Sequence, residues 1–127
     1  RERGHLIDVM PTLRAVAGAD YPETFAGNVI QAEEGVNLLP ALNGKSLPER
    51  PIYFEHQEAR ALIRGDFKLV WSKRMPWEID WELYNLKNDR CETTDLADEY
   101  PARVRQLADE WLAYARRVKL YPFYLSE

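Results

Sequence analysis

Residues 52–71 read Ile-Tyr-Phe-Glu-His-Gln-Glu-Ala-Arg-Ala-Leu-Ile-Arg-Gly-Asp-Phe-Lys-Leu-Val-Trp, and this stretch decides the fold. The runs 52–56, 60–64 and 67–71 are rich in β-branched and aromatic residues, which is typical of strands. The pair Gly65-Asp66 stands between the second and third runs and predicts a tight hairpin turn. The stretch therefore predicts three consecutive antiparallel strands.

The chain after this stretch supplies one more strand and a helix. Residues 82–86 read Glu-Leu-Tyr-Asn-Leu and predict the fourth strand. From Pro101 to about residue 118, large apolar residues recur at spacings of three and four, which indicates an amphipathic helix. We therefore predict that residues 51–127 form an α+β subdomain. In it, a small four-stranded antiparallel sheet is packed by a C-terminal helix over about residues 101–118.

The first 50 residues have a different character. Apolar residues recur at helical spacing over about residues 9–17, with Asp8 as the expected N-cap and Gly18 as the stop signal. Residues 19–51 are rich in Pro and Gly, and so long an irregular span is uncommon in a free-standing domain. The apolar face of the helix also needs a partner that the neighbouring sequence does not offer. We expect residues 1–50 to pack on a larger body that is missing, and the chain to be a fragment.

Composition excludes several classes of function. The 127 residues carry 17 Lys and Arg against 21 Asp and Glu, a net charge of −4, without the clustered basic face that nucleic acid needs. No run approaches the 18 apolar residues of a membrane span, so no membrane partner is expected. The single cysteine excludes an internal disulfide and a cysteine-based zinc cluster.

The candidate site residues lie at the end of the first strand. His56 stands beside a short polar connection, where pocket residues commonly lie, and Glu55 and Arg60 flank it. All three are candidates for a substrate pocket, although Glu55 and Arg60 could instead pair across the sheet. Adjacent strand residues point to opposite faces, so Glu55 and His56 do not predict a metal site. For His5 we expect a local structural role, and no residue is assigned a catalytic role.

Four phrases spread along the chain resemble, in the same order, those of one known family. They are His5-Leu-Ile-Asp-Val-Met-Pro-Thr-Leu with Ala17-Gly18; Gly35-Val-Asn-Leu-Leu-Pro with Leu42-Asn-Gly-Lys-Ser-Leu; Tyr53-Phe-Glu-His with Arg60-Ala-Leu-Ile-Arg-Gly-Asp-Phe-Lys-Leu-Val; and Glu82-Leu-Tyr-Asn-Leu with Asp89, Glu92-Thr and Leu96-Ala97. The ordered set resembles the C-terminal region of arylsulfatase-type sulfatases, in the alkaline-phosphatase-like superfamily. The likeness covers residues 5 to about 120, with Arg90 where the family usually has Pro.

The resemblance implies a parent enzyme that hydrolyses sulfate esters with a formylglycine and a bound Ca²⁺. The formylglycine would come from a Cys or Ser in a short motif that Cys91 does not fit, because Glu-Thr-Thr follows it. No catalytic or metal-binding residue can therefore be carried over to this chain, and we expect it to be inactive alone. The resemblance also implies that residues 1–50 are the tail end of the family's large α/β domain. The implied partners are a missing N-terminal catalytic domain and a sulfated small molecule or glycan, and the implied location of the parent is periplasmic or secreted.

Two alternatives remain open. The parent could hydrolyse phosphate or phosphonate esters, because the superfamily includes such enzymes. The chain could instead be a free-standing α+β module that binds glycans on a platform of Trp71, Trp77 and Trp81.

Overall fold

The computed structural model describes residues 2–72 and 80–120, which fall into two compact units. The division lies between Pro48 and Glu49, close to the predicted boundary at residues 50 and 51. Whether the first unit belongs to a larger α/β domain stays a prediction. Among the helices of the described residues, none combines the length and the hydropathy that crossing a bilayer requires.

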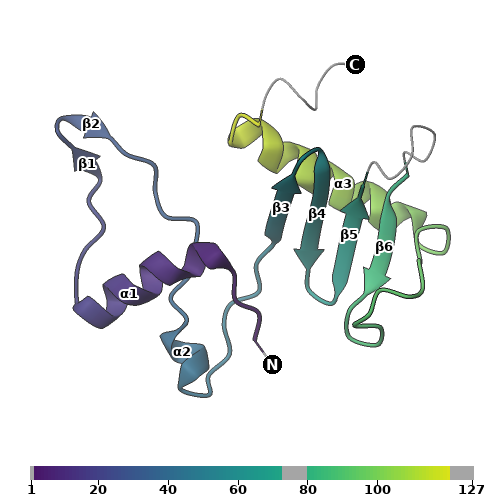
Figure 1. Cartoon of the computed structure of the whole chain (residues 1–127), viewed down its shortest axis with the longest axis horizontal. Coiled ribbons are helices and arrows are strands. Elements are labelled where there is room, and N and C mark those ends of the chain that lie inside the picture. Colours follow the sequence, from purple (N-terminus) through teal and green to yellow (C-terminus); the bar gives the residue numbers. More distant parts are fainter. Residues whose placement is uncertain (1, 73–79, 121–127) are drawn as a thin grey trace. The chain divides into compact units, whose positions relative to one another are not determined.

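The second unit contains the four predicted strands and the predicted helix (Figure 1). The strands are β3 (Ile52–His56), β4 (Ala59–Arg64), β5 (Phe67–Trp71) and β6 (Glu82–Asn85), all antiparallel in the order β3-β4-β5-β6. Helix α3 (Pro101–Arg117) covers one face of this sheet. The α+β fold class is therefore confirmed, and each element differs from its predicted bounds by at most one residue at either end.

One row of leucines forms the centre of the second unit. Leu62, Leu69 and Leu83 are direct cross-strand partners, and the helix residues Leu107 and Trp111 pack against them. All five side chains are fully buried. Burial of each leucine contributes roughly 1.5–3 kcal/mol as an upper bound, so this row is sufficient to dock α3 on the sheet.

Polar contacts fix the connection between β6 and α3. Lys68 Nζ lies 2.7 Å from both carboxylate oxygens of Glu92. A hydrogen bond from the Thr94 N–H, followed by others from the same loop, holds the pKa of the Asp89 carboxyl below its usual range.

The same connection covers the outer edge of β6. The N–H of Leu83 donates to Asp95 Oδ1 at 2.9 Å, and the N–H of Leu96 donates to the carbonyl of Leu83 at 2.8 Å. Both backbone groups of Leu83 are therefore paired on the side that faces away from β5.

The first unit contains a short 3₁₀ helix (Leu6–Asp8), helix α1 (Val9–Ala17), helix α2 (Leu39–Leu42), and a small hairpin of β1 (Thr24–Phe25) and β2 (Asn28–Val29). Helix α1 has the predicted bounds and ends at Gly18, whose φ of 63° is left-handed. The hairpin was not predicted. Its signal is the pair Ala26-Gly27, which takes φ values of 50° and 80° between the two strands.

Asp8 is the N-cap residue of α1, as predicted, but it does not cap the helix through its side chain. Its backbone is already helical, and its side chain makes no capping bond to α1. The buried carboxylate instead accepts from the N–H of His5 at 2.7 Å and from the N–H of Val36 at 2.9 Å. Asp8 therefore ties the start of α1 to a loop 28 residues away. His5 Nδ1 accepts from the Ile7 N–H at 3.4 Å, a local structural contact of the kind expected.

The apolar face of α1 is exposed. Leu13 and Val16 have 59% and 67% of their surface accessible, and Val9 and Met10 beside them are exposed as well. The opposite side of the helix is the one that its own unit covers, because Pro11 is buried and Thr12 bonds to the Leu38 N–H.

We expect Gly35→Ala to loosen the first unit by about 1–3 kcal/mol, because a side chain there overpacks a close backbone contact. A Cβ at this position would lie 2.1 Å from the carbonyl oxygen of Ile7. Hydrogen exchange of the α1 amides measures the effect. Gly4→Ala is the matched control, since its Cβ would meet only the end of the Leu38 side chain, at 3.4 and 3.9 Å. Equal exchange rates in the two variants would contradict the close approach.

Candidate functional site

The hairpin of β3 and β4 ends in a two-residue turn with a strained backbone. Gln57 and Glu58 have φ values of 49° and 73°, and neither is a glycine. Two-residue hairpin turns of this kind favour Asn-Gly, because a side chain makes positive φ costly. Strain of this kind persists only where the surrounding structure enforces it, and it often accompanies functional sites.

His56 lies directly before this turn, opposite Ala59. Its side chain is exposed and, by alternation along β3, shares a face with Phe54 and not with the residues that contact α3. The next row on this face is Phe54, Ala61, Val70 and Glu82. Phe54, Ala61 and Val70 make most of this row apolar. An imidazole at the rim of this apolar row can donate a hydrogen bond to a ligand that lies on it, or accept one from it.

Glu55 and Arg60 lie on the other face of the sheet. They are direct cross-strand partners, and Trp71 follows Arg60 in the same row on β5. The guanidinium carbon of Arg60 is 4.1 Å from the ring centroid of Trp71, 5.2 Å from that of Trp111 and 5.4 Å from that of Trp81. Arg60 is therefore packed between the helix and the sheet, while Glu55 is exposed.

The three candidates are neighbours along the chain but do not share one face. His56 lies on one face of the sheet, and Glu55 and Arg60 lie on the other. All three lie within three residues of the turn at residues 57–58. The sequence missed the aromatic surroundings of Arg60, because Trp81 and Trp111 are far from it along the chain. The one available signal was the number of tryptophans.

Trp71 is too buried to serve in the tryptophan platform that the glycan-binding alternative requires. Only 8% of this side chain is accessible, and the guanidinium of Arg60 lies over its ring. Trp81 is partly buried and packs against the core, and Trp77 lies outside the described residues.

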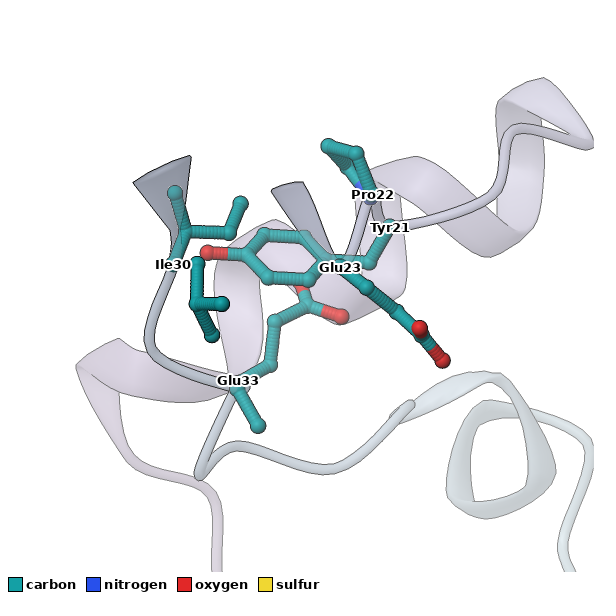
Figure 2. A pocket seen from close by; sticks show the side chains of 7 residues that line it. Tyr21, Pro22, Glu23, Ile30 and Glu33 are labelled. Atoms are coloured by element: carbon teal, nitrogen blue, oxygen red, sulfur yellow. The ribbon is translucent and has the colours of Figure 1, made fainter. Parts of the chain in front are cut away.

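A hollow of about 500 Å³ lies in the first unit. Figure 2 shows the ring of Tyr21 crossing it toward Ile30, with the carboxylate of Glu33 nearby and that of Glu23 pointing away. One oxygen of Glu33 accepts from Arg14 Nε at 2.9 Å, which holds the carboxylate in place. None of the sequence-predicted site residues lines this hollow.

The described residues offer no evident metal site. No group of three or more His, Cys, Asp or Glu in residues 2–72 and 80–120 is placed to hold an ion. The exposed Cys91 is the only cysteine of the chain.

Comparison with known proteins finds similarity to sulfatases. No family model matches the sequence. An uncharacterized sulfatase of Schizosaccharomyces pombe is 26% identical over 113 residues, which is 86% of this chain and 20% of that protein. The chain is a sulfatase homologue.

Solved structures agree with this sulfatase homology. The crystal structure of Ps i-CgsB matches 90% of the chain with a TM-score of 0.71 and 25% identity. BT4656, solved in complex with its substrate D-glucosamine-2-N,6-O-disulfate, matches 94% with a TM-score of 0.63, and at 20% identity it supports the fold alone. The chain spans only 24% and 25% of these two proteins, and it corresponds to their C-terminal part.

We expect the double variant Gln57→Asn, Glu58→Gly to be about 1–2 kcal/mol more stable than the native sulfatase homologue, because Asn-Gly relieves the positive-φ strain. Urea unfolding followed by tryptophan emission measures the change. Gln57→Ala keeps a side chain at positive φ and should bring no gain. A double variant that is no more stable than the native chain would show that the turn is unstrained.

Proposed function

We propose that this chain is the C-terminal part of a sulfatase whose catalytic domain is a separate portion of the parent protein. One observation carries the proposal: 86% of the chain aligns with only 20% of a sulfatase. In this proposal the intact parent hydrolyses sulfate esters, and the 127 residues alone are inactive. The parent is exported to the periplasm or secreted.

The exposed face of α1 supports a companion domain. Leu13 and Val16 leave most of their surface to solvent, and burying one such side chain contributes roughly 1.5–3 kcal/mol. An amphipathic helix of nine residues gains its stability from packing on its apolar face. We propose that the companion catalytic domain covers this face.

The Ca²⁺ and the formylglycine of the active enzyme belong to the companion domain in this proposal. When bound there, they supply the nucleophile and the charge that stabilises the sulfate group in sulfatases. The part of this chain is to form one wall of the substrate pocket. His56 contacts the substrate from the rim of the apolar row, with Glu55 at the same turn. Arg60 belongs to the wall without touching the substrate.

Reassembly of the parent from two parts tests the companion domain. The separately produced catalytic domain should bind this chain, and the mixture should release sulfate from an aryl sulfate that the chain alone leaves intact. Leu13→Asp should weaken binding about 10- to 100-fold, because it places a charge on the covered face. Ala15→Asp, on the other side of α1, is the matched control. An aryl phosphate assayed in parallel tests the phosphoryl alternative.

Turnover of the aryl sulfate by the isolated chain would contradict this division of labour. So would equal binding by the Leu13→Asp and Ala15→Asp variants.

For the reassembled enzyme, we expect His56→Ala to raise KM for the sulfated substrate about 3- to 10-fold with little change in kcat, the effect of one lost hydrogen bond in binding. Steady-state kinetics measure both constants. The chain has only one other histidine, and His5→Ala in the first unit serves as the control. An unchanged KM in the His56→Ala enzyme would contradict the proposal that His56 contacts the substrate.

A further inference from the structure

Three tryptophans from three parts of the second unit surround one cation. Trp71 ends β5, Trp81 directly precedes β6, and Trp111 lies within α3. Their ring centroids are 4.1, 5.4 and 5.2 Å from the guanidinium carbon of Arg60, all within the reach of a cation–π interaction of about 6 Å. We propose that these rings form a cation-binding box occupied by the chain's own Arg60, and that this occupancy holds the strained turn that follows His56.

The box suits a guanidinium in particular. Trp111 is fully buried, Trp71 is 8% exposed and Arg60 itself is half-buried, so the cation is partly shielded from water. A guanidinium is planar and weakly hydrated, so it stacks on an indole at a low desolvation cost. The ammonium of a lysine would be more strongly hydrated and could not stack on the rings in the same way.

The residues of the box contact both strands next to the turn. Arg60 is the second residue of β4, directly opposite Glu55. On β3, the indole N–H of Trp111 donates to the carbonyl of Phe54 at 3.3 Å. The hairpin is therefore held on each strand within two or three residues of Gln57 and Glu58, whose positive φ values need such support.

This arrangement makes Arg60 a positioning residue. Its guanidinium lies on the α3 face of the sheet, while His56 lies on the other, so Arg60 acts on His56 through the hairpin backbone. The box stands on the geometry of this chain alone. Its consequence for a substrate at His56 rests on the proposed function.

The test uses the full chain without any substrate. In Arg60→Ala, we expect the amides at the turn end of β3 and β4 to exchange about tenfold faster, the effect of losing a partly desolvated cation–π contact. Amides at the other end of the hairpin, near Ile52 and Ile63, are the internal reference. Methylguanidinium at low millimolar concentration should refill the box, which would restore the native tryptophan emission and slow the exchange again. Urea at the same concentration should restore neither.

Arg64→Ala is the matched control. Arg64 lies on the same strand and the same face, near Glu110 and not near the three rings, so its variant should not respond to methylguanidinium. Arg60→Lys should show intermediate protection, and it remains informative if Arg60→Ala does not fold. Native exchange in Arg60→Lys, or an Arg60→Ala emission that methylguanidinium leaves unchanged, would overturn the box. Neither readout involves turnover, so a failure of the box is distinguishable from a failure of the proposed function.

Discussion

Burial of Trp111 is the contact on which the second unit depends most. The indole is fully buried against the leucine row at the centre of the sheet, and its N–H reaches the carbonyl of Phe54 on the edge strand. One side chain thereby joins the helix to both the middle and the border of the sheet. Because a buried indole N–H needs a partner, the position of α3 and the course of β3 constrain each other.

The two units differ in how much of their apolar surface they bury internally. In the second unit, the large side chains of one sheet face and of the facing side of α3 are enclosed together. In the first unit, the buried carboxylate of Asp8 organises the backbone, while large apolar side chains of α1 remain accessible. A unit that is held by the Asp8 carboxylate, with its large apolar side chains exposed, suits a segment that packs against another domain. The small share of each relative that the chain spans agrees with this arrangement.

The local elements could be predicted from the sequence, whereas the contacts between distant residues could not. The run 67–71 and the helix that starts at Pro101 have clear periodicity and end signals, so their bounds agree with the structure. Asp is a residue type that commonly caps helices, but no local pattern indicates that the Asp8 carboxylate accepts a hydrogen bond from the distant Val36 N–H. The same limit applies to Arg60, whose packing depends on Trp81 and Trp111. His56 was placed correctly at a strand end, while its contact with a substrate stays a prediction.

The backbone bonds along the β6 border of the sheet limit how another protein can pair with it. At this border, the N–H and the carbonyl of Leu83 are paired on their outer side with Asp95 and Leu96. An incoming strand would have to displace these bonds before it could extend the sheet. Strand-by-strand growth, the usual route from exposed sheets to aggregates, is therefore hindered at the β6 border. Association through side chains on a face of the sheet does not require breaking these bonds.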